Sequence, residues 1–466
     1  MILDLSNKFL KKIGKIADDS GYEVYVVGGY VRDLILGIED KDIDIMITGD
    51  GIKFAEITAR EFGTELDAVY KNFETALLAT DEVKIEFASA RKESYDRNSR
   101  KPKVKTASLG EDLSRRDFTI NALAAGLNKN NYGEVTDLYG GCSDIENRII
   151  KTPLDPEKTF EDDPLRIMRA IRFASKLNFK IEEKTFEAIK NMRERLIDEG
   201  VVSQERITNE FLQILMSDKP SIGLDLLFKS GVMDIIFPEI SQLEGVDQRK
   251  DFHHKNVFYH TLIVVDNISK KSDDLWLRFA ALVHDIAKPR TKKFVDGTGW
   301  TFHGHEELGA RMMKKIFIRM KLPMNKLPYV EKLVRMHLRP IPLANDIVTD
   351  SAIRRLAAEA GEELEDLLKL CRADITSKNP DKVSKFMNNY EIVEKKILEV
   401  QEKDELRNFQ SPVRGEEIMS ICGISPGRQV GIIKKKIEEA ILEGEIPNDY
   451  KAAKEYLFKI KDERES

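Results

Sequence analysis

Asp42 and Asp44, separated only by Ile43, form a spacing that could support catalysis. Residues i and i+2 of a strand point to the same face, so the two carboxylates project together while Ile43 points into a core. Neighbouring carboxylates repel each other unless a cation lies between them, and two Mg²⁺ ions bridging a triphosphate are the usual occupants. An isolated pair of this kind is more often a solvated strand end. In its context, the pair predicts a two-metal catalytic site.

The stretch that precedes these aspartates predicts a phosphate-binding turn. An apolar run from Tyr25 ends in Gly28 and Gly29, and a short amphipathic segment with Arg32 follows, which gives strand, glycine turn, helix and strand in order. Glycine lets backbone N–H groups approach a phosphate at the N-terminus of the following helix. We therefore expect Gly28, Gly29 and Arg32 to contact a nucleotide.

Two further motifs follow within one domain length. Residues 115–122, RRDFTINA, predict the start of a helix that leaves Arg116 and Asn121 available to a nucleotide. Residues 162–177 predict a helix with a polar stripe, because four charged residues recur every third position. The stripe consists of Asp163, Arg166, Arg169 and Arg172. The alternative is an internal ladder of salt bridges.

The stripe also suggests how a base could be recognised. A carboxylate supplies acceptors and a guanidinium supplies donors in fixed geometry, so Asp163 and Arg166 together can imitate the Watson–Crick edge of a partner base.

In this order and spacing, the motifs closely resemble the class II tRNA nucleotidyltransferase and bacterial poly(A) polymerase family. The resemblance implies template-independent transfer of nucleotides from CTP and ATP to the 3′ end of tRNA, which completes CCA. It also implies that Asp163 and Arg166 select CTP and ATP, and that Arg169 and Arg172 hold the nucleotide. Asp162 stands where the commonest form of the family has Glu, a conservative departure.

Three alternatives remain beside CCA addition. Poly(A) polymerase shares these motifs, but the basic Gly-containing segment that such polymerases carry after the catalytic strand is missing around Tyr70, where the chain reads AVYKNFETALL. A partial enzyme that adds only CC or only A keeps the same signatures. A hydrolase or signalling protein with a degenerate head is disfavoured, because an inactive head has no physical need for clustered like charges.

The histidines indicate a second centre, since all seven fall between His253 and His337. The segment ALVHDIAKP matches the centre of the HD phosphohydrolase pattern, and that resemblance implies a metal site. Its predicted ligands are His260, His284, Asp285, His305, His337 and Asp374. Imidazole with carboxylate suits Ni, Mn, Co, Fe or Zn better than Mg²⁺. The resemblance implies hydrolysis of 2′,3′-cyclic phosphates or phosphomonoesters, such as those at damaged tRNA ends.

Three other segments allow two interpretations each. Glu86 alternates with Ile85 and Phe87, so it is either a third carboxylate beside the aspartate pair or an exposed strand residue. Residues 91–105 are basic without apolar periodicity, which predicts a mobile loop that is either solvated or an RNA contact. The turn at 426–427 before Lys434–Lys436 is either a phosphate site or a plain helix connector.

Length and composition set the frame. The 466 residues, 41% hydrophobic and 33% charged, predict several globular domains. No apolar run is long enough for a membrane span, the three scattered cysteines fit a cytoplasmic protein, and the net charge of −6 confines RNA contact to local basic patches. We expect an α+β head with a small mixed sheet at 1–150, a helical neck at 151–235, an HD-type helical body at 236–395 and a helical tail that contacts tRNA at 396–466. Oligomeric state is not predictable.

Overall fold

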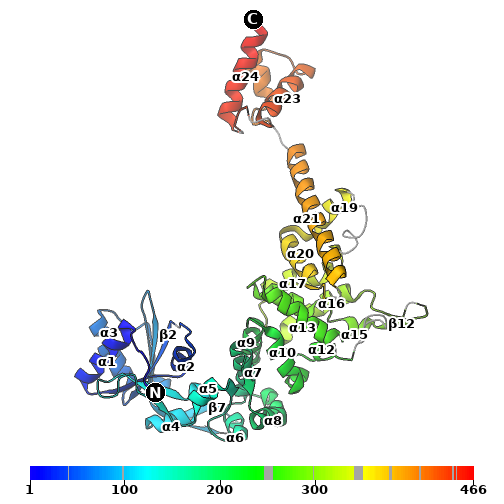
Figure 1. The fold of residues 1–466 in the computed structure, drawn as a ribbon. Helices are drawn as coiled ribbons and strands as arrows, with labels where there is room; N and C mark the ends of the chain where they lie inside the picture. The colour runs from blue at the N-terminus through cyan, green and yellow to red at the C-terminus, as the bar shows by residue number, and fades with distance from the viewer. Residues whose placement is uncertain are drawn as a thin grey trace. The chain divides into compact units, whose positions relative to one another are not determined.

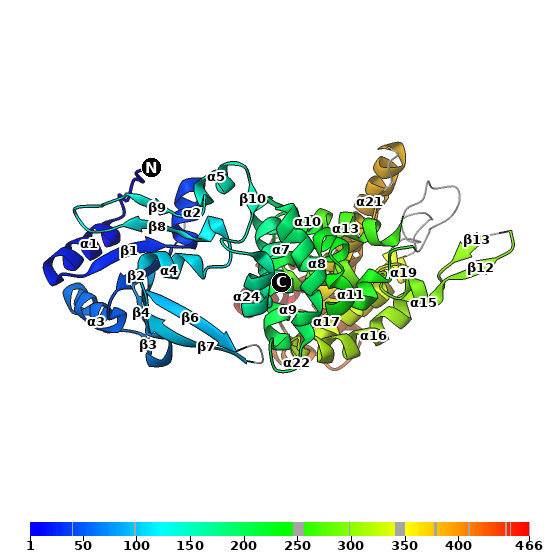
Figure 2. The same ribbon diagram turned by 90° about the horizontal axis from the view of Figure 1, so that it is seen from below.

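The computed structural model describes residues 1–466 except 40, 97–98, 246–255, 298, 341–349, 377–379, 409–410, 443–444, 448 and 466. Contacts divide the chain into two compact units, of which the first contains residues 1–340 and 362–383 and the second contains 341–361 and 384–466. Figures 1 and 2 show the elements of both units, coloured along the chain. Each unit is described by itself.

The first unit begins with a sheet-containing head. Seven strands form one sheet in the order β3-β4-β5-β2-β1-β8-β9, in which β2 and β5 are parallel and the other neighbours are antiparallel. Its elements are α1 (Lys8–Ser20), β1 (Glu23–Val27), α2 (Gly29–Leu36), β2 (Asp42–Thr48), α3 (Gly51–Phe62), β3 (Ala68–Tyr70), η1 (Lys71–Phe73), β4 (Thr75–Ala79), β5 (Lys84–Ser89), β6 (Arg91–Asp96), β7 (Ser99–Thr106), α4 (Leu109–Ser114), η2 (Thr119–Asn121), β8 (Leu123–Gly126), β9 (Val135–Asp137) and α5 (Gly141–Glu146).

The two faces of β2 differ as its alternation predicts. Ile43 and Ile45 are buried, and Ile45 lies beside Phe87 of β5, whose ring packs 6.0 Å from the ring of Phe54 in α3. On the opposite face, Met46 joins a buried cluster with Leu113 of α4. Because α4 covers only the far part of that face, the start of β2 keeps its carboxylates exposed.

Two expectations for the head are wrong. Residues 91–105 are not an irregular loop, because β6 and β7 pair there as a separate antiparallel ribbon. Residues 115–122 do not open a helix. Their only helical turn is the three-residue 3₁₀ segment η2, since Ala122 is followed at once by β8, whose ladder to β1 competes for the same backbone.

Helices form most of the remainder of the first unit, which confirms the expected fold class. Two short pairs interrupt them, β10–β11 (parallel) and β12–β13 (antiparallel). The elements are β10 (Ile149–Ile150), α6 (Pro156–Asp162), α7 (Leu165–Leu177), β11 (Lys180–Ile181), α8 (Glu183–Met192), η3 (Arg193–Ile197), α9 (Gln204–Leu215), α10 (Pro220–Lys229), α11 (Val232–Ile236), α12 (Pro238–Ser241), α13 (Val257–Ser269), α14 (Leu275–Val283), α15 (Lys288–Thr291), β12 (Lys293–Val295), β13 (Gly299–Thr301), α16 (His305–Arg319), η4 (Met324–Lys326), α17 (Leu327–Met336) and α20 (Leu364–Ala373).

The second unit contains helices with a small core of their own. Its elements are α19 (Asp350–Ala360), η5 (Gly361–Glu363, at the boundary between the units), α21 (Pro380–Asn408, which crosses that boundary), α22 (Gly415–Cys422), α23 (Arg428–Leu442) and α24 (Tyr450–Glu465). Ile418 of α22, Ile437 of α23 and Leu457 of α24 belong to one buried cluster. Among the described helices of the chain, none combines the length and hydropathy needed to span a bilayer.

Candidate nucleotide site and metal centre

The start of β2 presents the predicted carboxylates. Asp42 and Asp44 are exposed on one face, and the parallel register places Glu86 of β5 beside Asp44 and Lys84 beside Asp42. Three carboxylates therefore share one face of two adjacent strands, with one lysine at the edge. This arrangement of oxygen ligands suits a hard divalent cation.

Gly28 lies between β1 and α2 with φ +72°, a conformation that residues with a side chain rarely adopt. A Cβ on Gly28 would stand 2.8 Å from Nη1 of Arg116 and 3.6 Å from Oδ2 of Asp44. The backbone conformation therefore favours glycine here, and a Cβ would also displace the guanidinium of Arg116, whereas its contact with Asp44 would be an ordinary one. Gly28 brings the N-terminus of α2 next to the carboxylate face.

A cavity of about 580 Å³ opens beside this turn. It brings together most of the residues predicted from the head and the neck, namely Gly28, Gly29, Arg32, Asp44, Arg116, Asp163, Arg166, Arg169 and Arg172. Among the described residues that line it, Asp44 is included and Asp42 is not. The polar stripe of α7 thus faces the same space as the glycine turn, although the two are more than 100 residues apart in the sequence.

Two adjacent arginines reach the cavity from the end of α4. Asp112, which is buried, accepts hydrogen bonds from Arg115 (Nη2, 2.7 Å) and Arg116 (Nη2, 3.0 Å). Burial raises the pKa of Asp112, but Arg116 and Arg115 outweigh it and hold that pKa below its usual value. The carboxylate is therefore charged and fixes the direction of both guanidinium groups.

A chain of hydrogen bonds crosses the floor of the cavity. Arg32 donates to Asp33 through Nε and Nη2 (both 2.8 Å) and to Asn121 Oδ1 through Nη1 (2.7 Å). Asn121 in turn donates to Asp117 Oδ1 (2.9 Å). Asn121 also lines the cavity, so its availability to a nucleotide stays a prediction, although its amide already makes one hydrogen bond on each side.

The chain continues into α7. Arg169 donates to Asp117 Oδ2 through Nε (2.8 Å) and Nη2 (2.6 Å), and Arg172 donates to Glu210 of α9 (2.6 Å). Burial raises the pKa of Asp117, yet Arg169 and Asn121 bring it down to about 2. Asp117 raises the pKa of Arg169, whereas burial lowers that of Arg172. These arginines form salt bridges with carboxylates of other elements and also line the cavity, so both interpretations of the stripe remain open.

Phe173 supports three of these guanidinium groups. Its ring centroid lies 5.1 Å from Cζ of Arg32, 5.4 Å from that of Arg169 and 4.3 Å from that of Arg172. Cations over an aromatic face are attracted by the ring quadrupole, most strongly where water is excluded. The ring therefore spaces three like charges that would otherwise repel each other.

Asp163 and Arg166 lie at the beginning of α7. Asp163 Oδ1 accepts from the backbone N–H of Leu165 (3.2 Å), and Arg166 Nη2 donates to the backbone carbonyl of Arg115 (2.6 Å). Both side chains also line the cavity. That the two side chains recognise a base edge stays a prediction.

The sequence reasoning missed four anchors of this site, Asp112, Asp117, Glu210 and Phe173. Asp117 follows the predicted arginine pair, but a carboxylate beside arginines gives no sign of its burial. Glu210 carries no local motif. Phe173 lies one residue beyond the stripe at Arg172, where an apolar residue is expected to be part of the core.

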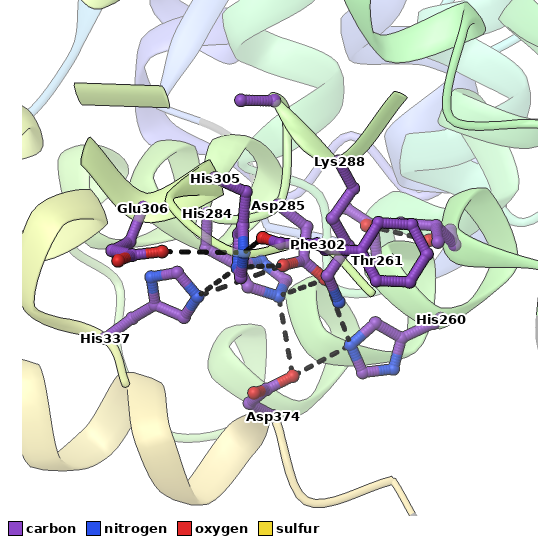
Figure 3. Close-up of polar contacts among 12 residues, drawn as sticks. His260, Thr261, His284, Asp285, Lys288, Phe302, His305, Glu306, His337 and Asp374 are labelled. Carbon is purple, nitrogen blue, oxygen red and sulfur yellow. Dashed lines mark hydrogen bonds and ion pairs between the residues drawn. The ribbon is translucent and has the colours of Figure 1, made fainter. Parts of the chain in front are cut away.

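The second centre lies in the body and is drawn in Figure 3. His260 comes from α13, His284 and Asp285 follow α14, His305 begins α16, His337 ends α17 and Asp374 ends α20. The structure brings all six together. Asp285 lies between two groups of ligand atoms, one with His260 and His284 and the other with His305 and His337, and within each group these atoms are within 4.8 Å of one another.

Distances within the cluster are short. Nε2 of His260 lies 2.8 Å from Oδ1 of Asp374, and Nε2 of His284 lies 3.2 Å from Oδ2 of Asp285 and 3.4 Å from Oδ1 of Asp374. Nε2 of His305 lies 3.2 Å from Oδ1 of Asp285 and 3.3 Å from Nε2 of His337.

The backbone fixes the direction of three imidazoles. Nδ1 of His284 contacts the carbonyl of Ala281 (2.8 Å), Nδ1 of His305 that of Phe302 (2.7 Å), and Nδ1 of His337 that of Val334 (2.6 Å). Each carbonyl lies three residues before its histidine, and a carbonyl oxygen can only accept a hydrogen bond. The Nδ1 atoms of these three histidines are therefore protonated, which leaves their Nε2 atoms toward the other residues of the cluster, as in metal sites whose ligands are oriented from behind.

The electrostatics of the cluster match this geometry. Burial lowers the pKa of His284, but Asp285 and Asp374 outweigh it and raise that pKa to about 10. Burial, together with the charge of His284, lowers the pKa of His337 to about 3. Nε2 of His284 is buried and makes no hydrogen bond of good geometry among the described residues. A nitrogen donor set with two carboxylates and one orphaned imidazole fits a transition metal.

Comparisons with known proteins match both centres. Residues 24–151 match the poly A polymerase head domain, residues 178–243 match the probable RNA and SrmB-binding site of polymerase A, and residues 257–379 match the HD domain. The CC-adding tRNA nucleotidyltransferase of Thermus thermophilus is 30% identical over 439 residues, which covers 91% of each protein. The chain belongs to the tRNA nucleotidyltransferase family. It therefore combines a nucleotidyltransferase that uses a divalent metal with an HD domain.

Relatives within this family carry different names. The multifunctional CCA protein of Vibrio campbellii is 33% identical over 368 residues, which covers 76% of this chain and 85% of that relative. The A-adding enzyme of Aquifex aeolicus is 36% identical over 58% of this chain, which spans only 32% of that relative. A solved tRNA nucleotidyltransferase with a primer tRNA and an ATP analogue is 25% identical, with a TM-score of 0.59 over 82% of this chain and 98% of that one.

Proposed function

We propose that this nucleotidyltransferase adds CCA to the 3′ end of tRNA, using CTP and ATP. The observation that supports this best is the shared cavity, where the carboxylate of Asp44, the turn at Gly28 and the charged stripe from Asp163 to Arg172 face one space. A triphosphate, a sugar and a base each find a matching group there. The family membership agrees with this chemistry.

Each part of the site has a proposed role. Asp42 and Asp44 would hold two Mg²⁺ ions, which would supply charge neutralisation at the transferred phosphate and activation of the RNA 3′ hydroxyl. The N-terminus of α2, which begins at Gly29, and Arg116 would bind phosphate, because the helix end and the guanidinium both donate N–H groups. Asp163 and Arg166 would read the base, while Arg169 and Arg172, held by Asp117 and Glu210, would keep the nucleotide in place.

A second candidate is partial addition, because the relatives include enzymes named for adding only CC or only A. Purified protein with Mg²⁺ should be offered tRNA transcripts that end before CCA, after CC and after CCA, each with labelled CTP or ATP. Full activity predicts CTP incorporation on the first transcript and ATP incorporation on the second. Incorporation of CTP alone, or of ATP alone, would replace the proposal with the partial one.

For the HD centre we propose a phosphohydrolase that opens 2′,3′-cyclic phosphates by adding water, or removes terminal phosphate. His260, His284, Asp285, His305, His337 and Asp374 would hold one or two Ni, Mn, Co, Fe or Zn ions, which would supply Lewis acidity. Metal analysis after Mg²⁺ removal, followed by hydrolysis assays with Ni²⁺, Mn²⁺ and Co²⁺, tests this. No bound metal and no hydrolysis with any of the three would leave the cluster a structural relic.

Two further roles complete the proposal. The tail at 396–466 would contact tRNA, with the lysines of α23 as phosphate ligands. The cytoplasm is the proposed compartment, because tRNA maturation occurs there and the three cysteines are free thiols.

A further inference from the structure

A small hairpin next to the HD centre exposes two aromatic rings. β12 and β13 pair with Phe294 opposite Trp300, and both views show the ribbon extending from α15 and α16 away from the neighbouring helices (Figures 1 and 2). Phe294 is 59% exposed, Val295 42% and Trp300 39%. The two rings lie 5.3 Å apart and nearly perpendicular. Exposed aromatic rings gathered on one ribbon mark a binding surface.

The charge of the segment indicates the kind of ligand. Residues 288–301 contain four basic residues and one acidic residue, Asp296. Nζ of Lys292 lies 4.6 Å from the ring centroid of Trp300, so cation and aromatic face form one surface. Aromatic faces interleaved with lysine and arginine are the combination that binds single-stranded nucleic acid, because bases stack and phosphates pair with the cations.

The two ends of the hairpin are attached to the metal cluster. Phe302, which follows β13, accepts through its backbone carbonyl from Nδ1 of His305 (2.7 Å). Lys288, which precedes β12, donates to Oδ2 of Asp285 (2.6 Å), and its Nζ lies 5.7 Å from the ring centroid of Phe302. The base of the hairpin is therefore formed by the residues that orient Asp285 and His305.

We propose that this hairpin binds the single-stranded end of an RNA by stacking bases on Trp300 and Phe294, and that it presents the terminal phosphate to the HD centre. The substrate class of that centre is then an RNA end rather than a free mononucleotide. The substrate class rests on the proposed phosphohydrolase activity, whereas the binding of RNA by the hairpin does not.

Binding is tested by tryptophan fluorescence. The chain has two tryptophans, and Trp276 is buried, so quenching by an added base reports on Trp300. A short oligoribonucleotide with a 2′,3′-cyclic phosphate should quench the emission of wild-type protein, and Trp300→Phe should lose that quenching. Unchanged emission at saturating RNA would overturn the proposal and would leave the hairpin as a docking element for a protein.

Substrate choice is tested by comparing two substrates. For Phe294→Ala with Trp300→Ala, the ratio of kcat/KM for the oligoribonucleotide to kcat/KM for a 2′,3′-cyclic mononucleotide should fall roughly five- to hundredfold, as expected for lost base stacking. Ile318→Ala, which removes an equally exposed apolar residue from α16, should leave the ratio unchanged.

The outcomes separate the two proposals. If wild-type protein hydrolyses neither substrate, the phosphohydrolase proposal fails while the quenching experiment still decides the hairpin. If both substrates are hydrolysed and the double variant leaves the ratio of their kcat/KM values unchanged, the hairpin does not select RNA ends.

The two adjacent lysines of the hairpin allow a further check. Lys292→Ala with Lys293→Ala should make the salt dependence of RNA binding shallower by roughly one unit per lost phosphate contact.

Discussion

The nucleotide cavity and the HD cluster solve the same problem, the placement of charge around phosphate, in opposite ways. Asp42 and Asp44 stand exposed at the start of β2, and Asp44 together with several arginines lines an open space of about 580 Å³. In the cluster, five of the six side chains are buried, and the ligand atoms within each of its two groups lie within 4.8 Å of one another. We therefore propose that the first site admits a large substrate together with its metal and that the second retains a metal.

The means of support differ as well. Side chains of the cavity are held by other side chains, in one chain from Arg32 through Asn121 and Asp117 to Arg169. Imidazoles of the cluster are held by backbone carbonyls of their own helices or turns. A single substitution in the cavity network should therefore affect several partners, whereas one in the cluster should act mainly on the metal.

The largest expected effect comes from substituting the proposed metal ligands of one site and measuring the activities of both sites. Asp44→Ala should lower nucleotide addition by at least about a hundredfold and leave HD hydrolysis intact, because changes merely behind a metal ligand already cost ten- to hundredfold. Asp42→Ala should behave alike. Asp285→Ala with His284→Ala should abolish metal retention and hydrolysis while addition persists. The measurements are incorporation of labelled CTP, metal content, and hydrolysis of a 2′,3′-cyclic nucleotide.

Two results would contradict this separation. Wild-type turnover in Asp42→Ala or Asp44→Ala would remove that residue from catalysis. Loss of both activities in any one variant, with circular dichroism unchanged, would mean that the two sites depend on each other.

Arg166→Ala should act on base selection next. Arg166 donates to the backbone carbonyl of Arg115 and lines the cavity. A hydrogen bond to a charged donor contributes about 1.5 to 3 kcal/mol, so discrimination against UTP and GTP should fall about ten- to hundredfold. Lys176→Ala is the control, because Lys176 lines the same cavity beyond the predicted stripe. A drop in affinity with unchanged base preference would make Arg166 a phosphate ligand instead.

The sequence could predict those parts of the molecule that rest on local rules. Alternation along residues 42–45 predicted which face of β2 is exposed, and the three-residue spacing predicted which side chains of α7 share a face. The HD residues were predicted from their resemblance to the HD pattern, with the clustered histidines in support. For β2 and α7, the spacing of residues along one element carried the information, whereas the HD residues come from five elements.

Contacts between distant elements could not be predicted in this way. Asp117 and Glu210 are anchors only because Arg169 and Arg172 of α7 reach the segment before η2 and the helix α9 in space, and no periodicity records these contacts. The 3₁₀ turn at 119–121 is determined by the strand that follows it. The ribbon of β6 and β7 is determined by their pairing, which a basic sequence without alternation does not indicate. Tertiary context overrode the local pattern at these points.

A smaller effect is expected at Phe173, whose uncharged ring supports the guanidinium groups of three arginines. Phe173→Leu keeps an apolar side chain but removes the aromatic face, and each cation–π contact is worth about 0.5–1 kcal/mol. KM for CTP and ATP should rise about three- to tenfold with little change in kcat. Phe118→Leu is the control, because Phe118 packs edge-on against Phe173, and it should lower stability without raising KM. Equal KM changes in both variants would reduce Phe173 to a packing role.

The smallest expected effect is the pH dependence contributed by Asp117. Burial raises its pKa, but Arg169 and Asn121 lower it in the folded protein from 3.8 to about 2. Because the folded pKa lies below the unfolded one, the group stabilises the fold fully above about pH 4, and this contribution is lost as the pH falls toward 2. The shift corresponds to about 2 kcal/mol. Calorimetry between pH 5 and about pH 2.5 should show a shallower loss of stability for Asp117→Asn than for wild type, with the exposed Asp81→Asn as control. Parallel pH curves for all three proteins would mean that Arg169 is held by Glu210 and Phe173 rather than by the charge of Asp117.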